Sequence, residues 1–215
     1  GLPSGLAIGV EVTSFTLMSL FIARMGAVAS ASHQIASSLA ALLYMVPLAL
    51  GIATSARTGY WIGARRMDRA RHAIQVGLLL SLGLALLCSA GLWLGRGWVA
   101  HAFTADETVA LAAAAWLGGV ALYHLADALQ AVCIFVLRCF GITLAPLLIY
   151  TGFLWGLGLM GGYTLAYRGL WQWPARPQVD SFWIASTLAL LCVSMIFLVL
   201  VWHAAHPRRH PTHSA

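Results

Sequence analysis

Six apolar stretches, each about as long as a bilayer is thick, dominate this sequence. They cover residues 6–23, 35–54, 73–94, 110–137, 144–167 and 182–202. About 20 residues of α-helix cross the roughly 30 Å of hydrocarbon in a bilayer, so each stretch is long enough to cross once. Of the 215 residues, 61% are hydrophobic and 8% are charged, whereas about a quarter of a typical soluble domain is charged. The sequence therefore predicts an all-α integral membrane protein with six transmembrane helices.

The arginines are distributed unevenly between the two ends of these helices, and the chain has no lysine. Eight arginines follow the second, fourth and sixth stretches: Arg57, Arg65, Arg66, Arg69, Arg71, Arg138, Arg208 and Arg209. Four follow the other stretches: Arg24, Arg96, Arg168 and Arg176. Because basic loops stay preferentially in the cytoplasm, we expect the segment 57–71 and the C-terminus to be cytoplasmic. The net charge of +6 then reflects topology and membrane-lipid contact, so we expect no nucleic-acid partner.

Domain organisation follows from the same pattern. We expect residues 1–205 to form one six-helix lobe and residues 206–215 to form a polar cytoplasmic tail that contains His and Arg. The first stretch has no basic region before it and no cleavage pattern after it, which argues against a signal peptide. A chain that starts directly in a span also suggests a piece of a longer polypeptide.

Two acidic residues lie well inside apolar stretches, Glu11 in the first and Asp127 in the fourth. A charge near the bilayer centre costs about 2.5–3.5 kcal/mol on insertion scales, so it needs a partner, a water-filled cavity or a function. The low dielectric of the bilayer interior disfavours the ionised form of a carboxyl group, and a cation bound to the carboxylate offsets that cost. We therefore interpret both acids as candidates for a site that exchanges protons for cations. The competing interpretation is a protonated carboxyl group that hydrogen-bonds a neighbouring helix.

Helical spacing places polar and aromatic residues on the Asp127 face of the fourth stretch. Trp116, Tyr123, Asp127 and Gln130 follow one another at steps of seven, four and three, and His124 lies beside Tyr123. Aromatic rings next to carboxylates suit an organic cation, which binds through ring-face attraction and charge pairing. Aromatic residues at this spacing also serve as ordinary helix-packing core, which is the favoured interpretation for Trp116. Tyr123, His124 and Gln130 are predicted to line a cavity with Asp127.

The first two stretches contribute further candidates. Ser14, Phe15 and Met18 follow Glu11 at helical spacing. We expect Ser14 and Gln34 to line the cavity, and Phe15 to serve mainly in packing. Three GxxxG pairs are weak signals of close helix packing: Gly5 with Gly9, Gly59 with Gly63, and Gly158 with Gly162. Pro47 is expected to kink the second stretch, because proline removes a backbone donor.

Enzyme chemistry has little support in this sequence. No GxSxG, HExxH, Walker or dinucleotide-binding motif occurs, so we expect no enzyme activity and no cofactor. His124 and Asp127 form an HxxD pair, but a metal site needs three or four ligands and no other histidine lies inside the expected spans. The metal expected is therefore limited to a Na⁺ ion at Glu11 and Asp127. An intramembrane enzyme that uses His124 and Asp127 as acid and base, and a non-transporting scaffold, remain open alternatives.

Four separated segments carry a family resemblance. They are GLPSGLAIGVE at 1–11, ASHQIASS at 31–38, PLALGIATSARTGYWIGARRMDRAR at 47–71 and YHLADALQAVCIFVLR at 123–138. Together they resemble the multidrug and toxic compound extrusion (MATE) family over essentially the whole chain. Cys139 departs from the family, which often has glycine after the arginine that ends YHLADALQAVCIFVLR.

The resemblance implies a fold and a function. Family members have twelve helices in two six-helix lobes, and this chain resembles helices seven to twelve, so an N-terminal lobe is the expected partner. It implies that Glu11 and Asp127 bind the coupling ion, Na⁺ or H⁺, and that Tyr123 lines the same cavity. The expected function is antiport of small amphiphilic organic cations, which is multidrug efflux, across the plasma membrane, the inner membrane of a bacterium. A lipid-linked saccharide flippase or exporter of the wider superfamily is the alternative, although the two acids disfavour the cationic cavity it needs.

Overall fold

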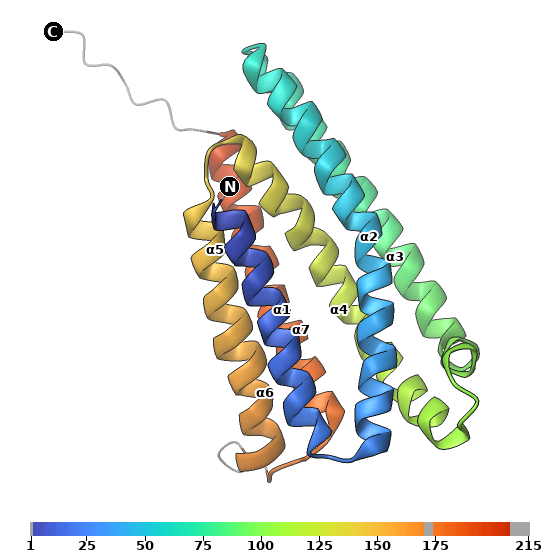
Figure 1. The fold of residues 1–215 in the computed structure, drawn as a ribbon. Coiled ribbons are helices and arrows are strands. Elements are labelled where there is room, and N and C mark those ends of the chain that lie inside the picture. The colour runs from blue at the N-terminus through green and yellow to red at the C-terminus, as the bar shows by residue number, and fades with distance from the viewer. Residues whose placement is uncertain (1, 170–173, 207–215) are drawn as a thin grey trace, which may run out of the picture.

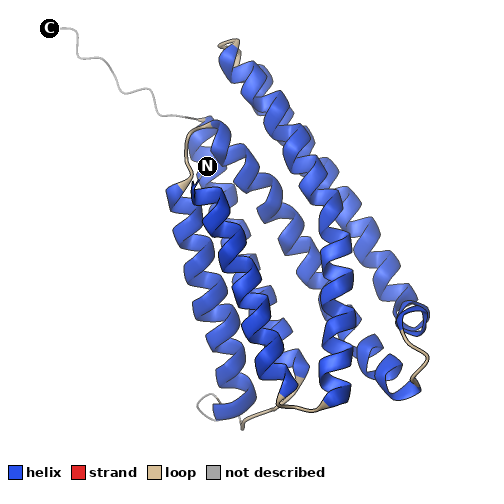
Figure 2. Cartoon of the chain, viewed as in Figure 1, coloured by secondary structure: helices blue, strands red, loops and turns tan. Residues whose placement is uncertain are grey.

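The computed structural model describes residues 2–169 and 174–206, and within this part the secondary structure consists of helices joined by short loops (Figure 2). The side chains of residues 2–4, 7, 8 and 11 lie outside this description. The helices are α1 (Leu2–Ala23), α2 (Ala27–Gly63), α3 (Met67–Phe103), α4 (Glu107–Cys139), α5 (Leu144–Thr151), η1 (Gly152–Met160), α6 (Gly161–Tyr163), η2 (Thr164–Arg168) and α7 (Val179–Ala205). The segments η1 and η2 are π-helical turns within one continuous run that starts at α5.

Six crossings result, as the sequence predicts. Among the described residues, α2, α3, α4, the run Leu144–Arg168 and α7 are long and apolar enough to span a membrane. The sixth, α1, has 22 residues, which also suffices for one crossing. The N-terminus, the α2–α3 turn and the end of α7 all lie at one end of the bundle (Figure 1). The basic segment 57–71 and the end of α7 are therefore on the same side, as the arginine distribution requires.

The second and third helices are longer than their apolar stretches. Both α2 and α3 have 37 residues, whereas the apolar stretches have roughly 20, the length needed to cross a bilayer. Hydropathy marks the part of a helix that lies in hydrocarbon, and the backbone hydrogen bonds continue through Arg57 and Gly63 beyond it. Helix α2 also runs through Pro47 without ending, and its ribbon changes direction along its length (Figure 1).

The core of the bundle is α4, which packs against α2, α3 and α7 and crosses obliquely between them (Figure 1). It is buried along most of its length, and many of its buried side chains are alanine. Small side chains let helices approach closely where lipid provides no hydrophobic drive. Hydroxyl groups on α3 reach the α4 backbone: Ser89 Oγ donates to the Ala121 carbonyl at 2.7 Å, and Ser81 Oγ to that of Ala128 at 3.3 Å.

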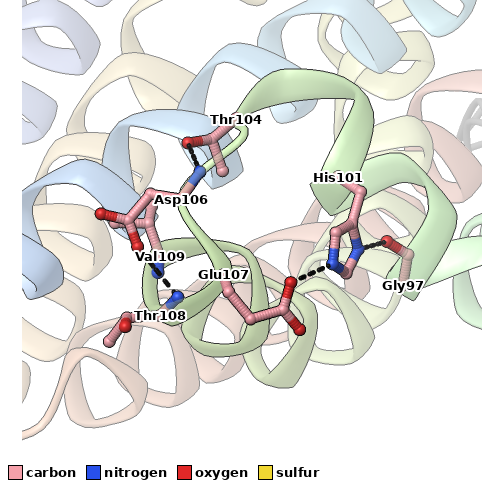
Figure 3. A network of polar contacts seen from close by, with 7 residues as sticks. All are labelled: Gly97, His101, Thr104, Asp106, Glu107, Thr108 and Val109. Atoms are coloured by element: carbon pink, nitrogen blue, oxygen red, sulfur yellow. Dashed lines mark hydrogen bonds and ion pairs between the residues drawn. The ribbon is translucent and has the colours of Figure 1, made fainter.

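The turn between α3 and α4 is fixed by acids that the sequence places outside the apolar stretches (Figure 3). Asp106 Oδ1 accepts hydrogen bonds from the backbone N–H groups of Thr108 at 2.9 Å and Val109 at 3.2 Å, which caps the start of α4. His101 bonds Glu107 Oε2 through Nε2 at 3.0 Å and the Gly97 carbonyl through Nδ1 at 2.8 Å. Both partners are acceptors, so both bonds form together only with the protonated ring.

The GxxxG pairs behave differently from one another. A Cβ at Gly158 would lie 3.6 Å from Ser186 Cα, and one at Gly162 would lie 3.0 Å from Phe182 Cα. This pair therefore provides close contact with α7, as predicted. The other two pairs make no such contact with the described residues. A Cβ at Gly5, Gly9 or Gly63 would meet nothing within 4 Å. A Cβ at Gly59 would meet only Cys139 Sγ, at 4.0 Å.

The predicted division into a lobe of residues 1–205 and a tail of residues 206–215 stays a prediction. Helix α7 ends at Ala205, and residues 207–215 lie outside the described part of the chain.

Candidate functional site

A cavity of about 410 Å³ opens between α1, α2 and α4. Its lining is mostly apolar, aromatic or hydroxylic and includes one acid: Val12, Phe15, Thr16, Ser19, Gln34, Ser37, Ala40, Ala41, Tyr44, Met45, Tyr123 and Asp127. Arginine and histidine do not occur among these described lining residues. The cavity is therefore a concave, largely apolar site whose described lining contains one acid and no base, which is a chemistry that suits an organic cation.

Asp127 provides that negative charge from the buried middle of α4. Its exposed fraction is 4%, and Gln130, one turn further along the helix, donates a hydrogen bond from Nε2 to Asp127 Oδ1 at 3.2 Å. The amide orients the carboxylate without neutralising it. Asp127 is thus a buried, oriented acid at the wall of the cavity.

Aromatic rings from three helices surround the cavity wall next to Asp127. The Tyr123 ring meets Trp183 edge to face at 5.3 Å between centroids, and Phe15 at 6.4 Å. Phe15 also lies 6.4 Å from Trp183. Because these rings support one another, the two that line the cavity, Phe15 and Tyr123, are held in place by packing.

The structure brings some of the predicted site residues to the cavity and leaves others outside its lining. Tyr123, Asp127 and Gln34 line it, and Gln130 reaches it through Asp127. Ser14 and His124 are buried but lie outside the lining. The reason is helical geometry: each directly adjoins a lining residue, Phe15 or Tyr123, and therefore lies about 100° away around its helix.

Glu11 is placed by its backbone alone. It lies in α1, four residues before Phe15, and its side chain is outside the described residues. A shared cation site at Glu11 and Asp127 therefore stays a prediction. Among the described residues, no group of three or more His, Cys, Asp or Glu side chains is arranged to hold a metal ion.

Two residues behind the cavity wall escaped the sequence analysis, His33 and Trp183. The apolar stretch that marks the second crossing starts at residue 35, but α2 starts at Ala27, which puts His33 inside the helix with 2% of its surface exposed. The two rings lie 5.9 Å apart. The ASHQIASS segment contained a signal for His33, because the small residues around it let neighbouring helices approach closely. Trp183 gave no comparable signal, since its contacts depend on how α7 packs.

His33 links α1 to α2 through a small hydroxyl network. Its Nε2 lies 3.1 Å from Ser19 Oγ on α1 and 3.3 Å from Ser37 Oγ on α2. The Ser19 hydroxyl donates to the Phe15 carbonyl at 2.9 Å, so the His33 Nε2–H group is the donor to Ser19. Ser19 and Ser37 both line the cavity, and His33 therefore fixes the wall from behind.

Replacing His33 with Ala is expected to destabilise the protein by about 1–3 kcal/mol, because it removes a buried ring and its hydrogen bonds to two partly buried hydroxyl groups. The measurement is the thermal unfolding midpoint of the complete protein in detergent. The exposed His203 on α7 provides the control, and His203→Ala should leave the midpoint within error. Equal midpoints for the two variants would show that the network does not hold α1 against α2.

Comparison with known proteins identifies the family. The family model described as MatE matches residues 3–164. The chain is 41% identical over 200 residues to "Probable multidrug resistance protein NorM" of Aromatoleum aromaticum, covering 92% of this chain and 42% of that protein. It is 35% identical over 210 residues to the protein of the same name in Shewanella oneidensis, covering 98% and 45%. The chain thus spans less than half the length of these relatives.

Solved structures show the same fold. The eukaryotic MATE transporter AtDTX14 superposes with a TM-score of 0.83 at 21% identity, over 94% of this chain and 44% of that one. A multidrug resistance MATE family transporter of the MOP superfamily in an outward-facing conformation gives 0.83 at 16% identity, over 95% and 45%. On the family match, the sequence identities and the six-helix fold, this chain belongs to the MATE family.

Proposed function

We propose that this chain is one lobe of a secondary antiporter that exports amphiphilic organic cations in exchange for Na⁺ or H⁺. The observation that supports it best is Asp127, a buried carboxylate that lines a cavity with aromatic walls. The names of the bacterial relatives, multidrug resistance proteins NorM and MdtK, agree with efflux of chemically varied compounds. In this proposal a second six-helix lobe supplies the facing wall, and the protein lies in the bacterial inner membrane with its C-terminus in the cytoplasm.

The proposed mechanism is mutual exclusion at one negative site. A coupling cation and a positively charged drug compete for Asp127, with Glu11 as the second carboxylate from α1. The apolar and aromatic lining binds the ring systems of the drug through Phe15 and Tyr123, and the carboxylate binds its charge. Loading of one cation therefore favours release of the other. Alternating access follows if the lobe moves against its partner around this site.

The residues that line the cavity also favour a cation antiporter over the three alternative functions. A lipid-linked saccharide carries phosphate groups and needs cationic side chains, whereas the described lining contains an acid and no arginine or histidine. An intramembrane enzyme built on His124 and Asp127 needs both groups at the cavity, and His124 lies outside its lining. A scaffold without transport would have no need for a lined cavity with a buried acid.

Transport by the complete protein in liposomes tests the proposal. With ethidium as a fluorescent organic cation, an imposed Na⁺ or pH gradient should drive its movement against its own concentration gradient. Whichever of the two gradients drives transport identifies the coupling ion. An anionic dye of similar size serves as the control and should not move. Ethidium flux that neither gradient alters would overturn the antiport assignment.

A further inference from the structure

A second concave site lies between α2 and α3 and shares no lining residue with the cavity around Asp127. Its volume is about 530 Å³. Arg57, Trp61, Arg69 and His72 line one end, and Val76 and Leu80 continue the lining along α3. This α2–α3 groove therefore has a cationic end and an aliphatic end.

The cationic end holds two arginines on one indole ring. The guanidinium carbon of Arg57 lies 5.2 Å from the centroid of the Trp61 ring, and that of Arg69 lies 4.7 Å from it. Among the described residues, the two ion pairs are Arg66 with Asp68 and His101 with Glu107, so neither groove arginine has a carboxylate partner. A phosphate at this end of the groove would give these guanidinium groups an anion as an acceptor of charge-assisted hydrogen bonds.

The aliphatic end continues in the direction of the bilayer. His72, Val76 and Leu80 follow one another at steps of four, so they form one stripe on α3. Val76 is 40% exposed and Leu80 is 53% exposed, and both are available to an acyl chain. Arginine and tryptophan at the membrane interface with aliphatic residues beyond them match a phospholipid in charge and in polarity.

We propose that the α2–α3 groove binds an anionic phospholipid. Its phosphate group lies at the cationic end that Arg57 and Arg69 line, with Trp61 and His72 beside the headgroup. One acyl chain follows Val76 and Leu80 along α3. A soluble phosphate would use the cationic end alone and leave the aliphatic stripe uncovered, which is why the groove favours a lipid. The site is independent of the antiport proposal, because it shares no residue with that cavity.

Lipid titration of the complete protein in neutral detergent tests this site. Phosphatidylglycerol should raise the thermal unfolding midpoint in a saturable way, whereas phosphatidylcholine with the same acyl chains should raise it much less. In the variant Arg57→Gln/Arg69→Gln, the apparent affinity for phosphatidylglycerol should fall at least about tenfold, since two charge-assisted contacts are lost.

The matched control is Arg65→Gln/Arg66→Gln. It removes the same charge from exposed positions in the same turn, outside the groove. It should keep the wild-type affinity. An equal loss in both double variants would mean diffuse attraction of lipid by the basic turn, and would overturn the site.

A second variant distinguishes binding of a lipid from binding of a free anion, and it leaves the arginines unchanged. Val76→Trp fills the aliphatic end from an exposed position, and it should weaken phosphatidylglycerol binding while the protein remains folded. Inorganic phosphate alone should produce no saturable shift at the lipid concentrations used. A full shift with phosphate, or unchanged lipid affinity in Val76→Trp, would overturn the assignment to a lipid.

Discussion

Replacing Asp127 with Asn is expected to reduce cation-driven transport at least about tenfold while the protein still inserts and folds. A tenfold change in binding corresponds to about 1.4 kcal/mol, and the attraction between a carboxylate and a cation in a low-dielectric cavity exceeds that amount. Asn has the shape of Asp and keeps Oδ1 as an acceptor for the Gln130 amide at 3.2 Å. The substitution therefore removes the charge and preserves the geometry. Ethidium transport in liposomes measures the result.

Glu107→Gln is the matched control, because it removes one negative charge from the exposed start of the same helix. It should transport at close to the wild-type rate. A structural role for Asp127 predicts something different, namely a lower unfolding midpoint with transport reduced only in proportion to the folded protein. Wild-type transport in Asp127→Asn would remove the basis of the antiport proposal.

Replacing Gly77 with Ala is expected to destabilise the helix bundle by about 1–3 kcal/mol, the usual cost of overpacking. A Cβ at Gly77 would overlap the Thr54 side chain, with 2.8 Å to Thr54 Cβ. Thr54 is buried at 6% exposure, and its β-branched side chain has few alternative rotamers. The helices α2 and α3 must therefore separate. The unfolding midpoint of the complete protein in detergent measures the loss.

Gly83 gives an internal control on the same helix, because a Cβ there would meet nothing within 4 Å. Gly83→Ala should stabilise the protein by about 0.5–1 kcal/mol through helix propensity. Adding Thr54→Ala to Gly77→Ala should restore part of the lost stability, since the two residues are in contact. If Gly77→Ala and Gly83→Ala behave alike, the close contact between α2 and α3 does not limit stability.

The number of crossings was predictable from the sequence, and the helix ends were not. Hydrophobicity reports contact with hydrocarbon, so it locates the crossings but stops where Arg57 and its neighbours begin. The helix continues there because its backbone hydrogen bonds form in water as well as in hydrocarbon, although their net contribution is smaller in water. His33 was missed for the same reason, since it lies at the polar start of α2.

For the candidate site, the spacing of residues predicted helix faces, whereas the functional roles of the residues stay predictions. The spacing rule places Tyr123 and Asp127 on one face of the helix, and both line the cavity. It also included His124 and Ser14, which lie outside the lining, because a single helix cannot show which side faces its neighbours. The sequence also did not reveal the close packing of helices. The tightest glycine contact among the described residues is that of Gly77 with Thr54 on α2. Gly77 belongs to no GxxxG pair, so that motif could not predict the contact.

The length of α2 and α3 has a mechanical consequence. A 37-residue helix is about 55 Å long, some 25 Å more than the hydrocarbon it crosses, and the α2–α3 turn lies beyond the ends of the neighbouring helices (Figure 1). Only residues 55–63 of α2 follow its apolar stretch on the side of the turn, so the arm there is roughly 14 Å long, and a rotation of the lobe by about 10° displaces its end by about 2 Å on that helix geometry. If the lobe rocks as proposed, the turn moves farther than the part of α2 inside the bilayer, and a spectroscopic label at Ala64 would record that displacement.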